Sequence, residues 1–133
     1  MVRVGDLTIQ DQAAVLPAAK TAYFTRDISI TGTQAITGLG FKPASILFLA
    51  AIITSDSVSI ASMNGGSGLG IFNSGEETAD TWSVASHCIV MTTGIGIVGY
   101  GNVSSIDTDG FTITWAKSGS PTGTAGITYM AFK

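Results

Sequence analysis

The chain contains one histidine and one cysteine, and these two residues are neighbours, His87 and Cys88. A Cys–His catalytic pair or a Cys/His metal site would therefore have to use both side chains. On a β-strand, adjacent side chains point to opposite faces, which would keep these two apart. We expect no catalytic pair and no metal site here, and we interpret His87 as a polar surface or interface residue.

Two groups of carboxylates have the oxygen ligands that a hard cation such as calcium prefers. The first group is Glu76, Glu77 and Asp80, and the second is Asp107 with Asp109. The second group lacks the remaining ligands of an EF-hand loop, and an Asp-Gly pair is common in hairpin turns. No spacing in either group singles out two carboxylates for a glycosidase pair. We predict solvated loops, with a bound cation as the alternative.

Residues 94–99 (GIGIVG) match the G-x-G-x-x-G spacing of dinucleotide-binding loops. Residues 100–105 (YGNVSS) are poor helix formers, and no acidic residue stands about 20 positions further on to bind a ribose. We therefore expect no nucleotide cofactor. A glycine-bearing strand that bends at a sheet corner is the prediction for this segment.

Five aromatic residues would form a carbohydrate-stacking platform if they were exposed together. They are Trp82, Trp115, Tyr23, Tyr100 and Tyr129. Large aromatic side chains more often fill cores and subunit interfaces, and we interpret most of these five in that way.

Charged side chains make up 11% of the chain, against about 25% in an average globular domain. The six basic residues are Arg3, Lys20, Arg26, Lys42, Lys117 and Lys133. Nucleic-acid binding depends on clustered Lys and Arg, so we expect no nucleic-acid partner. A surface this poor in charge favours association, and we expect much of it to face other subunits.

Residues 81–106 contain no Asp, Glu, Lys or Arg, which raises the question of a membrane span. The stretch is rich in Ser, Thr and Gly, and its apolar run at residues 88–100 is shorter than the roughly 20 residues that a spanning helix needs. We expect no membrane segment.

Alternation of apolar and polar residues is the main structural signal, and it predicts short β-strands. Phe111, Ile113 and Trp115 alternate with threonines, so these three side chains are predicted to form a core face. Residues 127–132 carry apolar atoms on both faces, which is typical of a central strand or of an interface. Residues 46–53 (ILFLAAII) do not alternate, and we predict a strand buried on both sides, with Ile46 and Phe48 in the core.

Turn residues separate these strands. The NGGSG segment at residues 64–68 predicts a hairpin between residues 57–60 and 69–72, and the KSGSPTG segment at residues 117–123 predicts another between the last two strands. Residues 82–85 and 88–100 supply further strands. Together these signals indicate one all-β domain, an antiparallel β-sandwich of a jelly-roll-like kind with about eight strands.

Residues 1–22 differ from the rest and are predicted to form an extended N-terminal arm, with the sandwich at residues 23–133. Pro17 would interrupt a helix begun at Asp11, and the surrounding DQAAVLPAAK segment has weak strand propensity. Ordering an arm on contact costs about 1–2 kcal/mol per residue, which burial of apolar side chains must offset. The expected interface residues are Val2, Val4, Leu7, Ile9, Val15 and Leu16 in the arm, and Leu47 and Leu49 in the non-alternating strand.

Two stretches resemble β-sandwich proteins of tailed-bacteriophage virions. The first is residues 31–50 (TGTQAITGLGFKPASILFLA), in which a Gly-Phe-Lys-Pro turn leads into an apolar strand. The second is the ending, in which an Asp-Gly-Phe-Thr strand at residues 108–115 precedes a closing Tyr-containing strand at residues 127–132. The resemblance covers about a third of the chain.

This resemblance implies a head decoration or cement protein, or a tail-fibre or receptor-binding tip. The chain has no coiled-coil heptads and no collagen-like repeat, so it lacks the shaft of a fibre. We therefore expect a non-enzymatic decoration protein on the capsid surface of a virion, a homo-oligomer and most simply a trimer, that contacts the major capsid protein. A lectin-like module that contacts host-surface glycans is the alternative.

Overall fold

The computed structural model describes residues 18–52, 54, 57–63, 67–73, 79–84 and 87–133, and this part of the chain consists of strands and turns with no helix. The ten strands are β1 (Ala19–Asp27), β2 (Gly32–Ile36), β3 (Ser45–Ile52), β4 (Ser57–Ser62), β5 (Ser67–Asn73), β6 (Ala79–Val84), β7 (Ile89–Gly94), β8 (Ile97–Asp107), β9 (Gly110–Ser118) and β10 (Thr124–Phe132). The all-β prediction is confirmed, with two strands more than the eight expected.

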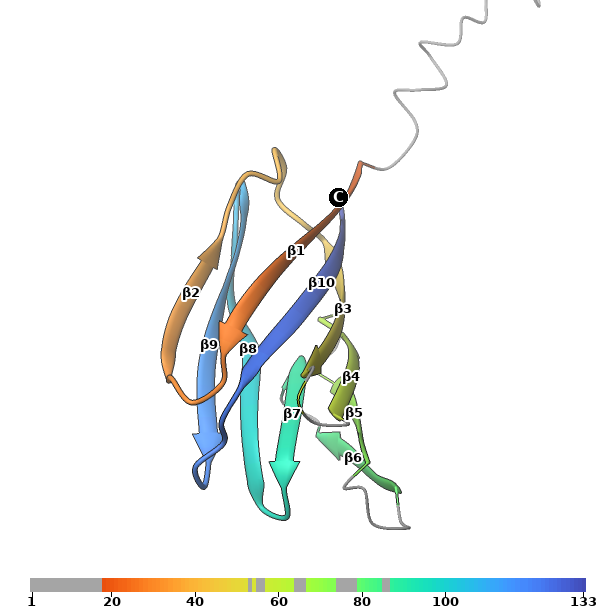
Figure 1. Ribbon diagram of the computed structural model, residues 1–133. Coiled ribbons are helices and arrows are strands. Elements are labelled where there is room, and N and C mark those ends of the chain that lie inside the picture. Colours follow the sequence, from red (N-terminus) through yellow and green to blue (C-terminus); the bar gives the residue numbers. More distant parts are fainter. Residues whose placement is uncertain (1–17, 53, 55–56, 64–66, 74–78, 85–86) are drawn as a thin grey trace, which may run out of the picture.

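The strands form two antiparallel sheets that face each other as a β-sandwich (Figure 1). The larger sheet has the order β1-β10-β3-β4-β5-β6, and the smaller sheet has the order β2-β9-β8-β7. Consecutive strands β3 to β6 form a meander in the larger sheet, and β7 to β9 form one in the smaller sheet. The strand β10 lies between β1 and β3, which confirms the prediction that the last strand is central or at an interface.

The core lies between the sheets and includes the five residues predicted for it. Phe48, Phe111 and Ile113 are 1% exposed or less, and Ile46 and Trp115 are also buried. The ring of Phe111 meets that of Phe48 edge-on at 5.7 Å from one sheet to the other. The predicted core face of residues 111–115 is therefore confirmed.

The predicted hairpin at residues 117–123 is wrong. Strand β9 belongs to the smaller sheet and β10 to the larger one, so this segment crosses from one layer to the other. Buried Pro121 and the Gly123 carbonyl, which accepts a hydrogen bond from the Ile28 N–H at 3.1 Å, hold the crossing in place. Both strands bury an apolar face in the same core. Two strands can do this side by side in one sheet, as in a hairpin, or in two sheets that face each other, so the apolar pattern does not distinguish the two arrangements.

The other predicted hairpin, between β4 and β5, is confirmed by their antiparallel pairing. The G-x-G-x-x-G segment has no helix after it and connects β7 to β8, with Gly96 at a φ of +72° in the turn. The predicted bend at a sheet corner is therefore a hairpin turn, in which a left-handed residue suits glycine.

The boundary predicted between arm and sandwich is also corrected. Strand β1 begins at Ala19, and residues 19–22 pair with residues 129–132 of β10. These four residues thus belong to the sheet, although their sequence, AKTA, has no apolar–polar alternation that would predict a strand. Residues 1–17, with all six predicted arm contacts, lie outside the described residues.

Candidate interaction surface

The outer face of the larger sheet turns away from the core, and its register brings together residues from distant parts of the chain. The central row runs across four strands through Tyr23, Thr128, Leu49 and Ile60. The rows on either side are Thr21, Met130, Leu47 and Ser62, and Thr25, Gly126, Ala51 and Val58. We call these three rows the outer face. It carries no charged residue.

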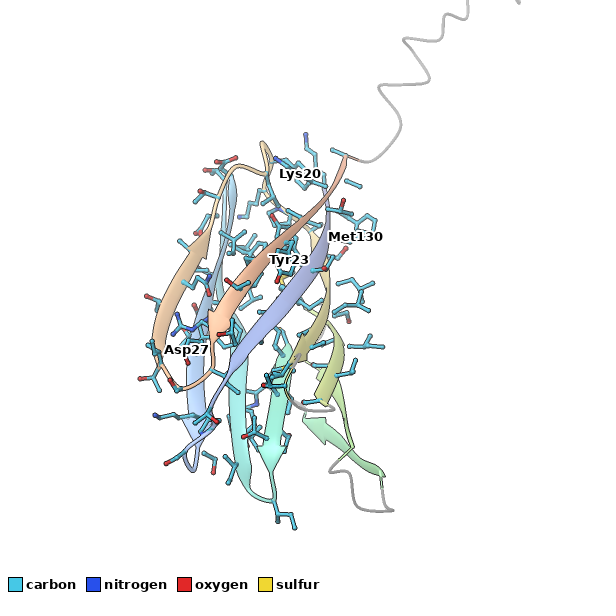
Figure 2. The ribbon with its side chains drawn as sticks, viewed as in Figure 1. Lys20, Tyr23, Asp27 and Met130 are labelled. Atoms are coloured by element: carbon cyan, nitrogen blue, oxygen red, sulfur yellow. The ribbon has the colours of Figure 1, made fainter. Side chains whose placement is uncertain are left out.

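Large apolar side chains on the outer face are open to solvent in the single chain. Tyr23 is 62% exposed and Leu49 is 46% exposed, while Val58, Ile60 and Met130 range from 38% to 43%. Figure 2 labels Tyr23 on β1 and Met130 on the neighbouring β10. Threonine and serine fill most of the remaining positions, so the face offers short, uncharged side chains around an apolar centre.

The prediction that residues 46–53 are buried on both sides is wrong for the single chain. Ile46, Phe48, Ala50 and Ile52 face the core, whereas Leu49 and Ala51 on the other side of β3 are exposed. The two predicted interface residues of this strand, Leu47 and Leu49, are neighbours on the outer face. Sequence reasoning did not assign Tyr23, Val58, Ile60 or Met130 to it, because register alone brings them there.

Charged side chains lie at the ends of the sandwich, where they hold turns. The Asp109 carboxylate, after the end of β8, accepts hydrogen bonds from the backbone N–H groups of Gly40 at 2.6 Å and Gly38 at 2.9 Å. Lys20 donates to the Gly38 carbonyl from the other side. The Gly40 and Gly38 bonds hold the pKa of Asp109 below its ordinary value of 3.8. Asp109 thus fastens the loop between β2 and β3.

The two carboxylate groups of the sequence do not form a cation site in the described residues. No group of three His, Cys, Asp or Glu side chains there could hold a metal ion. Asp107 accepts hydrogen bonds from the hydroxyls of Ser105 and Thr112, and Asp109 binds the loop. Glu76 and Glu77 lie outside the described residues, and the side chain of Asp80 is likewise not described.

His87 and Cys88 precede β7 and meet different surroundings. The His87 ring lies 4.6 Å from the Tyr100 ring, centroid to centroid, and is half-buried. The Cys88 thiol is buried in the core, where it contacts Asn102 Oδ1 at 3.7 Å. Burial raises the pKa of Cys88, and a hydrogen bond with the Val103 backbone opposes this. A thiol held in its neutral form is a poor nucleophile.

The five aromatic residues are divided between core and surface. Trp115 and Tyr129 are buried, Tyr100 is half-buried, and Tyr23 is exposed on the outer face. The side chain of Trp82 is not among those described. Because a stacking platform needs several exposed rings, these four positions do not make one.

Both flanks of the sandwich are closed by side chains that bind backbone. On one flank, Ser57 and Ser59 of β4 accept hydrogen bonds from the N–H groups of Thr92 and Val90 in β7. On the other flank, Gln34 of β2 donates to the Thr25 carbonyl of β1 at 3.4 Å. Next to Gln34, the Arg26 guanidinium lies 5.4 Å from the centre of the Trp115 ring. These contacts lie at the flanks and leave the outer face uncovered in the single chain.

Comparisons with known proteins identify no relative of this chain. The chain matches no family model, no curated protein and no solved structure. The part of the chain that the structure describes has no helix long and apolar enough for a membrane crossing.

Proposed function

We propose that the protein is a non-enzymatic structural subunit of a tailed-bacteriophage virion, a decoration or cement protein that stabilises the head through subunit contacts. The observation that carries the proposal is the outer face, on which twelve positions over four strands include no charge and five large exposed apolar side chains. Such a surface suits permanent contact with protein better than transient contact with a soluble substrate.

The described ionisable side chains support a contact role rather than a chemical one. Asp109 and Lys20 hold the loop before β3, Arg26 binds the carbonyls of Ile30 and Thr31, and Lys117 binds that of Ser29. Each charge thus stabilises a turn of the sandwich. Catalysis would instead require a nucleophile and a base that converge on an open site.

The two stretches that resemble virion proteins lie together in the fold. The first supplies β2, the loop at residues 37–44 and most of β3, and the second supplies most of β9 and of β10. They meet where Asp109 binds Gly38 and Gly40, and where β3 pairs with β10. The resemblance therefore concerns one contiguous part of the sandwich, which supports treating it as a shared structural unit.

In the proposed mechanism, the protein adds buried area to an assembled shell. A stable contact buries on the order of 1,600 Å² in total, and a ligand that binds only the assembled form stabilises that form by mass action. We place the protein on the capsid surface as a homo-oligomer, and we expect a trimer. Residues 1–17 would reach the major capsid protein or a neighbouring subunit.

Immunoelectron microscopy of intact virions, followed by thermal rupture of heads with and without bound protein, tests this function. We expect label over the head and a higher rupture temperature for decorated heads. The variant that lacks residues 1–17 should occupy heads less and protect them less. Label confined to the tail, together with binding of the purified protein on a glycan array, would replace this proposal with the receptor-binding alternative.

A further inference from the structure

Exposed apolar side chains are concentrated on one surface of the sandwich. Seven large apolar residues are strongly exposed in the described part of the chain, and Tyr23, Leu49, Val58, Ile60 and Met130 lie on the outer face. The other two, Ile30 and Ile95, lie in turns outside the strands. Among the side chains that the structure describes, the outer face is therefore the one place where several large exposed apolar residues lie together.

The smaller sheet offers a contrast. Its outward row across the three strands β2, β9 and β8 consists of Thr33, Thr114 and Asn102. Hydroxyl and amide groups in this row can keep their hydration in a free subunit, and none of the five large apolar residues lies there. This row of the smaller sheet thus differs in chemistry from the central row of the outer face, although both belong to antiparallel sheets.

The size of the larger sheet is close to what a stable contact needs. Strands lie about 4.8 Å apart, and residues on one face repeat about every 6.7 Å along a strand, so three rows across all six strands of the larger sheet cover about 580 Å². Two such sheets stacked over their whole width would remove about 1,160 Å² from water, near the lower limit of about 1,200 Å² for specific interfaces, and the four strands of the outer face account for about 770 Å² of this. A flat sheet stacks on another sheet at about 10 Å without further adaptation.

We infer that another copy of this chain covers the outer face, with the outer faces of the copies packed against one another. A subunit that met only a preformed shell would have to stay soluble with this apolar surface exposed, whereas surfaces buried permanently between identical subunits are the more apolar kind. The shell would then be contacted through other parts of the chain. This inference rests on the proposed structural role and names the partner for one of its contacts.

Light scattering on the purified protein tests the inference through a matched pair of variants. Thr128→Lys places a charge at the centre of the outer face, and Thr114→Lys places the same charge on an exposed threonine of the other sheet. We expect the unchanged protein and Thr114→Lys to have the mass of two or three copies of the 13.6 kDa chain. Thr128→Lys should give one copy with an unchanged strand spectrum in circular dichroism.

Hydroxyl-radical footprinting of the unchanged protein gives a second measurement that needs no variant. Met130 and Tyr23 should react several-fold more slowly at a concentration where the oligomer forms than after dilution to the monomer. Ile95, which is 90% exposed in a turn, should react equally in both. A monomer at about 100 µM, or an oligomer in which Met130 and Tyr23 are not protected, would overturn the inference.

These measurements contain no virions, so their outcome is separate from that of the proposed function. A monomeric protein that still raises the rupture temperature of heads would contradict the inferred contact between copies and would support the proposed function. An oligomer whose outer face is protected but which binds no heads would support the inferred contact between copies and would contradict the proposed function.

Discussion

The hydroxyl oxygen of Ser59 accepts a hydrogen bond from the backbone N–H of Val90 at 3.1 Å, so a strand of the larger sheet binds the edge strand of the smaller one. Ser57 and Thr92 repeat the contact at 3.0 Å. In both pairs a side chain takes the place that a neighbouring strand would occupy in a sheet. The flank at β7 is thereby closed without an eleventh strand in the described fold.

Replacement of Ser59 by alanine should lower the free energy of unfolding by about 1–3 kcal/mol, because the Val90 N–H would stay buried without a partner. Chemical denaturation monitored by circular dichroism measures this loss. Ser118→Ala, at an exposed position of β9 away from the outer face, should change stability by less than about 0.5 kcal/mol. Equal losses in the two variants would mean that the Ser59 bond contributes nothing specific.

The lowered pKa of Asp109 predicts a dependence of stability on pH. A carboxylate whose pKa is lower in the folded chain stabilises the fold above its unfolded value of about 3.8, and this contribution is lost as the pH falls through the folded pKa. We therefore expect Asp109→Ala to be less stable than the unchanged protein at pH 7, with a difference that narrows below pH 3.8. Denaturant titrations over this range measure it.

Thr108→Ala, at the exposed position beside Asp109, is the control for that experiment. It should leave the pH profile of the unchanged protein intact. A difference between Asp109→Ala and the unchanged protein that stays constant down to the most acidic pH would show that the carboxylate charge is not the cause.

Gly110 should tolerate no larger residue. A Cβ atom at this position would lie 1.9 Å from the Ile36 carbonyl oxygen, and the obstacle is backbone that cannot rotate away. We expect Gly110→Ala to lose at least about 3 kcal/mol of stability or to fail to fold. Gly96→Asn is the matched control, since that turn has open space and asparagine accepts a left-handed conformation. Comparable melting temperatures for both variants would contradict the prediction.

The N-terminal boundary of the sandwich can be located by truncation. Removal of residues 1–17 should leave the unfolding midpoint unchanged, because both sheets and the described core are built from residues 19–132. Removal of residues 1–22 also deletes the pairing of residues 19–22 with β10, and we expect a loss of about 2–4 kcal/mol from ladder hydrogen bonds at about 1 kcal/mol each. Identical denaturation curves for the two truncations would mean that residues 19–22 add no stability and that the sandwich begins after residue 22.

Local sequence patterns were sufficient for the fold class and for five of the sixteen buried residues that form the described core. Phe111, Ile113 and Trp115 alternate with polar residues, and this period of two can place three side chains on one face only in a strand. The NGGSG segment predicted the hairpin of β4 and β5, which pair antiparallel on either side of it, because glycine-rich segments favour tight reversals.

The candidate surface was only half predicted, because its residues meet through pairing over long distances in the chain. The run at residues 46–53 identified Leu47 and Leu49, but no local signal joins Tyr23 of β1 to Thr128 of β10 or Leu49 to Ile60. The apolar run was interpreted as buried on both sides, whereas the single chain leaves its outer side exposed. A partner subunit packed on the outer face would bury the exposed side of residues 46–52 as well, as the composition of this run predicts.

By itself, the sequence determined that this chain is an all-β sandwich, that Ile46, Phe48, Phe111, Ile113 and Trp115 face its core, and that the chain is poor in charge. Only the tertiary structure decided that the segment at residues 117–123 crosses between layers, that β10 lies between β1 and β3, and that five apolar side chains share one outer face. The physical reason is that alternation specifies which side of a strand is apolar but not which strand lies beside it. The choice of neighbouring strand depends on register and packing between segments up to about a hundred residues apart. The local apolar–polar pattern of two strands is the same whether they form a hairpin or are joined by a crossing between sheets.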